Sequence, residues 1–125
     1  MAVKDLVSGI NTGVPENVKT IAKGLLYRDF ITVVLLVNKL AIQGRDGQMI
    51  KDNWICVQEK EAKLGRIQIF NNWSPYMVKE PFKVWMGLEY FCIKDDEIWS
   101  MTDKEIVEFT INELELIGIV KKGRN

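Results

Sequence analysis

Apolar residues recur every three or four positions in two parts of the chain, which is the spacing of one face of an α-helix. The first part is PENVKTIAKGLL, from Pro15, where proline is expected in the first turn. The second part begins at Thr102, and Thr102 and Glu105 have the spacing of a capping box. Gly118 follows as the expected C-terminal cap. The pattern therefore predicts one helix towards each end of the chain.

Between these helices, apolar positions alternate or run together as they do in β-strands. The run ITVVLLVNK, from Ile31, is apolar on both faces, which predicts a central strand covered on each side. Further strands are predicted over residues 54–57, 65–70 and 83–93, and the charged turn between the first two favours a hairpin. The polar segment 43–53 is expected to be a loop.

The order helix, strand, loop, three strands and helix predicts an α+β fold. We expect a single domain over residues 1–125, with a mixed or antiparallel sheet of about four to six strands and flanking helices. Residues 119–120 start a possible strand that continues into 121–125 and stops. This ending leads us to expect a fragment of a larger protein.

The composition is that of an ordinary globular domain, with 47% hydrophobic and 27% charged residues. Lys plus Arg and Asp plus Glu number 17 each, so the net charge is zero and gives no reason to expect a nucleic-acid partner. The longest apolar run is far shorter than the roughly 20 residues of a membrane-spanning helix. Without a visible secretory signal, we expect a cytoplasmic protein with no membrane partner, in which Cys56 and Cys92 stay reduced.

The chain contains no histidine, which removes the commonest general base and the commonest transition-metal ligand. No CxxC, HExxH, GxSxG or phosphate-binding loop motif occurs either. Cys56 has no histidine to activate it, so nucleophilic catalysis is not expected from this thiol. We therefore assign no catalytic, metal-binding or cofactor-binding residue.

The densest cluster of candidate binding residues comes from two predicted strands and the loop after them: Trp54, Arg66, Asn72 and Trp73. Alternation along strand 65–70 points Arg66 away from the aliphatic core. An arginine beside aromatic rings can clamp a phosphate or a carboxylate, because its planar fork of donors matches two anionic oxygens. The alternative is structural, with Arg66 paired to Glu59 or Glu61 and the tryptophans filling the core. Both interpretations stay open at this point.

Other charged positions favour structural roles. Glu89 lies in an otherwise apolar strand, where an ionised carboxylate needs a partner. Arg28 and Asp29, at the start of the long apolar run, are expected to pair with each other. Asp95 and Asp96 are expected to form a solvated turn.

Four stretches, YRDFITVVLLVNK, DNWICV, GRIQIFNNWSPYMV and GLEYFCI, resemble the middle segment of flavin-containing amine oxidase and protoporphyrinogen oxidase-like proteins. The similarity spans roughly Asp5 to Val120, and the bacterial branch with YRDF and NWSP is often likened to UDP-galactopyranose mutases. In such proteins a Rossmann-type domain binds FAD, and an inserted sheet domain covers the substrate against the flavin. The resemblance implies that this chain is the substrate-covering domain. Its glycines form no GxGxxG fingerprint, so FAD would belong to the parent protein outside this fragment.

The mutase branch implies binding roles for the same cluster. Its eukaryotic-type members place a tryptophan, an arginine twelve residues later and a tyrosine seven residues after that around the nucleotide sugar. Trp54, Arg66 and Trp73 match this spacing, so by resemblance Arg66 meets the diphosphate and the tryptophans line the pocket. The chain departs from the pattern at Trp73, which replaces the tyrosine, and at Cys56, where a second pocket tyrosine is expected. By its position in this pattern, Cys56 joins Trp54, Arg66, Asn72 and Trp73 as a predicted substrate-binding residue.

Three functions stay open. The first is the substrate-binding domain of an FAD-dependent, amine oxidase-like oxidoreductase, inactive alone and completed by the missing FAD domain. The second is the matching domain of a UDP-galactopyranose mutase-like isomerase, which binds a nucleotide sugar. The third is a stand-alone protein-interaction module. In the first two cases the parent protein is an enzyme with a small-molecule substrate, and the fragment itself binds no cofactor.

Overall fold

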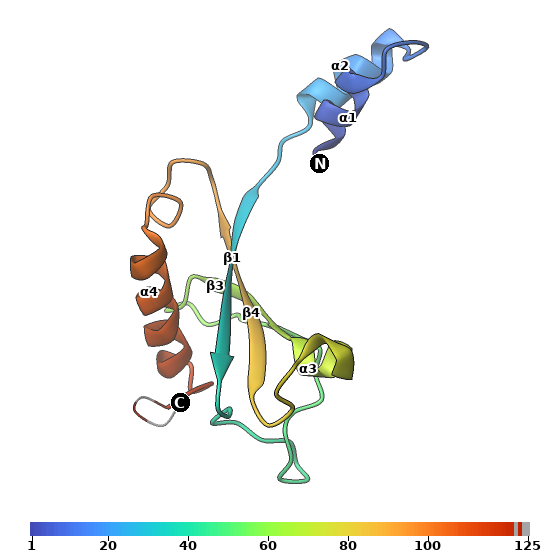
Figure 1. The fold of residues 1–125 in the computed structure, drawn as a ribbon. Coiled ribbons are helices and arrows are strands. Elements are labelled where there is room, and N and C mark those ends of the chain that lie inside the picture. Colours follow the sequence, from blue (N-terminus) through green and yellow to red (C-terminus); the bar gives the residue numbers. More distant parts are fainter. Residues whose placement is uncertain (122, 124–125) are drawn as a thin grey trace.

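Four antiparallel strands form one sheet at the centre of the protein, in the order β1-β4-β3-β2 (Figure 1). The structure is a computed structural model that describes residues 1–121 and 123. Its elements, in chain order, are α1 (Val3–Gly9), α2 (Glu16–Gly24), β1 (Asp29–Val37), β2 (Trp54–Cys56), β3 (Leu64–Ile69), α3 (Phe70–Trp73), the 3-10 helix η1 (Pro75–Met77), β4 (Val84–Cys92) and α4 (Asp103–Leu116). The predicted α+β fold with flanking helices is confirmed.

β1 is an edge strand. It pairs with β4 alone, over nine consecutive residue pairs, and β4 pairs with β3 on its other side. The prediction that the run from Ile31 lies in the middle of the sheet is therefore wrong. Its apolar residues do fall on two faces, but one face is open, where Phe30, Val34 and Leu36 are 58%, 48% and 40% exposed.

α4 covers the other face of the sheet and closes the core (Figure 1). Alternate side chains of β4 point towards it and are buried, as the strand pattern predicts: Val84, Met86, Leu88, Tyr90 and Cys92. The helix begins as predicted, because the Thr102 hydroxyl accepts the Glu105 N–H and the Glu105 carboxylate accepts the Thr102 N–H. Gly118 follows the helix with a φ of 76°, a backbone conformation that favours glycine.

A buried carboxylate ties α4 to the first residue of β3. Glu113 accepts hydrogen bonds from the backbone N–H groups of Lys63 (2.5 Å) and Leu64 (3.1 Å). Lys63 precedes β3, and Leu64 begins it beyond the residues that pair with β2, so the Glu113 side chain takes the place of a strand partner for these two donors. The contact joins residues about 50 positions apart in the sequence.

The opposite face of the sheet is covered only in part, by α3 (Figure 1). The Phe70 ring lies against Gly87, where an added Cβ would come within 2.8 Å of Phe70 Cζ. Asn71 fixes α3 to the strand, because its side chain donates to the Lys83 carbonyl (2.8 Å) and accepts from the Trp85 N–H (3.0 Å). Gly87 therefore allows α3 to pack against β4, while the sheet on either side of α3 stays uncovered.

α1 and α2 form a hairpin that extends away from the sheet, beyond the start of β1 (Figure 1). α2 is the helix predicted near the N-terminus, although Pro15 is its N-cap residue and not part of its first turn. The sequence pattern does not predict α1, because seven residues are too few to display helical periodicity. The hairpin is therefore a local structure attached to β1 through residues 25–28.

After α4 the chain turns back towards the loop that follows β1. The Ile119 carbonyl accepts a hydrogen bond from the Ala41 N–H (2.8 Å), and residues 119–120 are buried but bent, so they do not start the predicted strand. Residues 122, 124 and 125 of that prediction lie outside the described part of the chain. No helix in the described residues combines the length and apolar character needed to cross a membrane.

We predict that Glu113→Ala lowers the free energy of unfolding by about 2 kcal/mol, because it leaves two backbone N–H groups without their acceptor at a mostly buried junction. Urea unfolding followed by tryptophan fluorescence measures the change. Glu108→Ala, at an exposed position of the same helix, is the matched control and should change stability by less than about 0.5 kcal/mol. Equal effects of the two substitutions would show that Glu113 does not hold α4 on the sheet.

Candidate functional site

The open face of the sheet carries most of the predicted cluster. Trp54 and Cys56 of β2 lie on it, and Cys56 is the direct cross-strand partner of Arg66 on β3. Trp73, from α3, meets Trp54 edge to face with ring centroids 5.8 Å apart. Four of the five predicted binding residues are therefore neighbours, and both tryptophans are about half-exposed. The Cys56 thiol is free and exposed.

The Arg66 guanidinium lies against two aromatic rings. Its central carbon is 4.9 Å from the Trp54 ring centroid and 5.1 Å from that of Phe91, distances at which a cation is attracted to a ring face. Phe91 is not among the predicted site residues, although strand alternation places it on the same face as Glu89. Gly65 gives Phe91 its room, because an added Cβ there would lie 2.6 Å from the Phe91 ring.

Arg66 forms an ion pair with a buried carboxylate of the neighbouring strand. Its Nε and Nη2 atoms lie 2.8 and 2.6 Å from Glu89 Oε2, and Gln68 Nε2 donates to the other oxygen. The Arg66 side chain is 32% exposed, whereas that of Glu89 is 6% exposed. The prediction that Arg66 pairs with Glu59 or Glu61 is therefore wrong. The prediction that the Glu89 carboxylate needs a partner is confirmed.

The remaining donors of Arg66 define what the site can bind. A guanidinium has five N–H donors, and the contact with Glu89 occupies one on Nε and one on Nη2. Within the described chain, the Nη1 atom makes no hydrogen bond. Nη1 and Nη2 together form the end-on edge of the fork, which matches two oxygens of a phosphate or a carboxylate. Because Glu89 balances the charge, this edge would hold an anion through directional hydrogen bonds, while the rings of Trp54 and Phe91 hold the guanidinium in place.

Asn72 has a structural role. Its side-chain amide donates to the carbonyls of Ile50 (2.9 Å) and Asp52 (2.8 Å), which fastens the predicted loop 43–53 to α3. Both N–H donors of the amide are thus occupied. The prediction that Asn72 joins Arg66 in a ligand site finds no support in this geometry, since the amide points to the loop.

Of two further predictions for charged positions, one is wrong and one is confirmed in part. Asp29 accepts a hydrogen bond from the Lys94 backbone (3.3 Å), and no ion pair with Arg28 occurs among the described residues. Asp95 and Asp96 form the predicted turn, in which the Asp96 N–H donates to the Ile93 carbonyl (3.0 Å), but the Asp96 carboxylate also accepts the Trp99 N–H at 2.8 Å, which helps to lower the pKa of its carboxyl. These residues shape the ends of β1 and β4 and lie away from Arg66.

Tyr90 is a buried polar residue on the core face. Its ring packs beside Phe109 with centroids 5.9 Å apart, and its hydroxyl makes no hydrogen bond within the described chain. Burial raises the pKa of the phenol well above its usual range. Since this hydroxyl points away from the open face, it cannot contribute to the Arg66 site.

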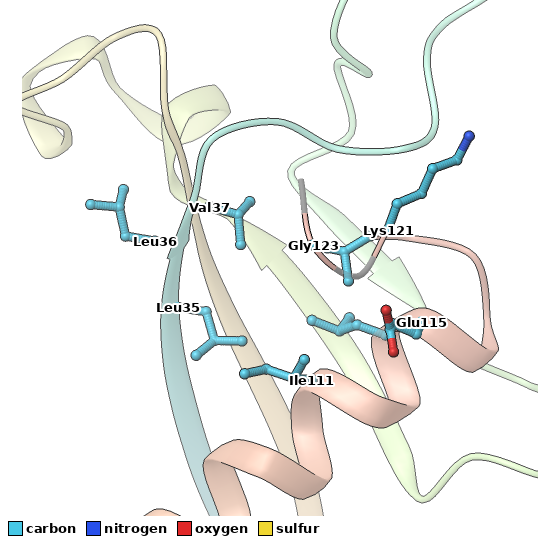
Figure 2. Close-up of a pocket in the computed structure, with 9 residues that line it drawn as sticks. Leu35, Leu36, Val37, Ile111, Glu115, Lys121 and Gly123 are labelled. Atoms are coloured by element: carbon cyan, nitrogen blue, oxygen red, sulfur yellow. The ribbon is translucent and has the colours of Figure 1, made fainter. Parts of the chain in front are cut away.

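A separate apolar pocket of about 200 Å³ lies at the C-terminal end of β1 (Figure 2). It is formed by β1, α4 and the segment after α4, with Leu35, Val37, Ile111, Leu114 and Val120 among its lining residues. None of the predicted binding residues lines it. The described residues also hold no group of three or more Cys, Asp or Glu side chains arranged to bind a metal ion.

Comparison of the chain with models of protein families, with curated proteins and with solved structures gave no match. The resemblance to flavin-dependent proteins therefore rests on the residues quoted for it above.

The ion pair between Arg66 and Glu89 predicts a strong asymmetry between single and double substitutions. Arg66→Met leaves Glu89 buried without its cation and should lower the free energy of unfolding by about 3–5 kcal/mol. The double substitution Arg66→Met with Glu89→Leu removes both charges and should cost less than about 1.5 kcal/mol. Urea unfolding of the two single variants and the double variant measures this cycle. Additive effects would mean that the pair contributes nothing to the fold.

Proposed function

We propose that this chain is the substrate-binding domain of an FAD-dependent oxidoreductase of the amine oxidase-like class. In this proposal another domain of the parent protein holds FAD, and the open face of the sheet closes over the substrate on the flavin. The chain would then supply binding and orientation, while the flavin supplies the redox chemistry. Taken alone it would be inactive.

One observation carries the proposal. The face that α4 leaves uncovered is where Arg66, Trp54 and Trp73 gather, so the side chains suited to bind a ligand lie on a surface that needs a cover. Scattered exposed apolar residues are normal, but a contiguous apolar patch around a polar group marks a binding surface. The resemblance to flavin-dependent proteins supports the proposal that a flavin lies on the other side of that surface.

A second candidate is the matching domain of a UDP-galactopyranose mutase-like isomerase. The end-on edge of Arg66 favours it, because a diphosphate offers paired oxygens to this edge while a flat base can stack on an indole. The ring of Phe91 and the ring of Trp54 would flank such a diphosphate. The two candidates share the Arg66 site and differ in the ligand it holds.

The proposed parent protein predicts what its gene encodes. We expect the open reading frame around this chain to specify a G-x-G-x-x-G fingerprint upstream of Met1 and a further flavin-contacting segment downstream of Asn125. Sequencing the genomic locus checks this directly. A reading frame that encodes neither segment would contradict both flavin-dependent candidates.

Titration with UDP-galactose separates the two candidates. For the mutase-type function, we expect millimolar UDP-galactose to shift the indole N–H signals of Trp54 and Trp73 in ¹H–¹⁵N spectra. Galactose alone should leave these signals unchanged, and inorganic pyrophosphate should shift them, because the diphosphate makes the contact. Arg66→Lys keeps a cation for Glu89 but loses the planar fork, so it should weaken the effect at least about tenfold. Unchanged indole signals with UDP-galactose would count against the mutase-type function.

A further inference from the structure

The ion pair at Arg66 gives a ligand orientation more than affinity. The Glu89 carboxylate lies 2.6 Å from Nη2 and balances the charge of the guanidinium, so an anion at the end-on edge gains little net electrostatic attraction. The hydrogen bonds that it makes there replace hydrogen bonds to water, and such an exchange contributes only modestly to binding. Most of the free energy of binding must therefore come from apolar contacts beside this edge.

Phe91 and Phe30 supply an apolar strip that begins at the guanidinium. The Phe91 ring centroid is 5.1 Å from the central carbon of Arg66, and Phe30 is the direct cross-strand partner of Phe91. Directly opposite residues of an antiparallel pair lie on the same face of the sheet, so both rings are on the open face. Phe91 is 41% exposed and Phe30 is 58% exposed. From β3 to β1 this strip spans two strand spacings, or about 10 Å.

The surface on the other side of Arg66 is already partly occupied. Trp54 and Trp73 pack edge to face there, with ring centroids 5.8 Å apart. Further along β4, the Phe70 ring of α3 lies over Gly87. The uncovered apolar surface that starts at the guanidinium therefore runs across β4 towards β1.

We propose that the substrate of the Arg66 site is a soluble amphiphilic anion. Its phosphate or carboxylate head binds the end-on edge of Arg66, and its apolar body lies on Phe91 and Phe30. This inference rests on the function proposed above, because it names the substrate class of the same site. A nucleotide sugar would place a polar sugar or leave both phenylalanine rings uncovered, so an amphiphilic substrate favours the oxidoreductase over the mutase-type isomerase.

Two alkyl phosphates that differ only in chain length test the substrate class. n-Octyl phosphate and ethyl phosphate, each below its micelle-forming concentration, are titrated while the Arg66 Nε–H and Trp54 indole N–H signals are followed in ¹H–¹⁵N spectra. Octyl phosphate should bind at least about thirtyfold more tightly, because even a half-buried methylene group contributes about a factor of two. Equal affinities would overturn the amphiphilic class and leave the Arg66 site in place. If neither compound shifts either signal, the Arg66 site itself is wrong, and the proposed function loses the observation that carries it.

Substitutions on β1 test where the apolar body lies. Phe30→Thr keeps a residue that favours strands and should weaken octyl phosphate binding about three- to tenfold, with no change for ethyl phosphate. Leu36→Thr is the matched control, because Leu36 is 40% exposed on the same face near the other end of β1, and it should leave both affinities unchanged. An equal loss with Leu36→Thr, or no loss with Phe30→Thr, would overturn the assignment of the strip.

Vesicles of phosphatidylglycerol distinguish a soluble amphiphile from a membrane lipid. In a bilayer the acyl chains point away from the headgroup plane, whereas the Arg66 edge and the strip require head and body to lie along one sheet surface. The chain should therefore stay in the supernatant when the vesicles are sedimented. Cosedimentation that Phe30→Thr abolishes would overturn the proposal and assign this face to a lipid surface.

Discussion

The carboxylate of Glu89, buried in the middle of β4, determines how the open face of the sheet is built. A carboxylate removed from water costs several kcal/mol unless hydrogen-bond donors and a cation surround it. β3 supplies both, through Arg66 and Gln68. Arg66 is held beside Trp54 and Phe91 as a consequence, because its guanidinium cannot leave Glu89 unpaired. The cluster that resembles a ligand site is thus also the solution to an electrostatic problem within the fold.

The same geometry sets the chemical character of that cluster. A free arginine would attract any anion through its charge, whereas the pair with Glu89 is neutral and keeps only the directional donors of the end-on edge. Selection among ligands then depends on shape, since two oxygens must fit the fork and a flat group must fit the indoles. The structural and the ligand-binding interpretations of Arg66 are therefore compatible, because they use different edges of one guanidinium.

Local signals in the sequence predicted the parts of the fold that depend on neighbouring residues. The capping box of α4 needs only Thr102 and Glu105, and strand alternation alone placed Arg66 on the face away from the aliphatic core. Such local signals did not predict contacts between residues that lie far apart in the sequence. Arg66 finds Glu89 23 positions away, and nearer glutamates were the expected partners. β1 was expected at the centre because both its faces are apolar, but apolar residues at Phe30 and Leu36 remain on an uncovered face.

The two faces of the sheet differ because α4 covers only one of them. Met86, Leu88 and Tyr90 of β4 are buried on the α4 side, whereas Arg66, Trp54 and Phe91 lie on the face that α3 covers only in part. Any domain that closes over the Arg66 cluster must therefore approach from the side of the sheet opposite α4.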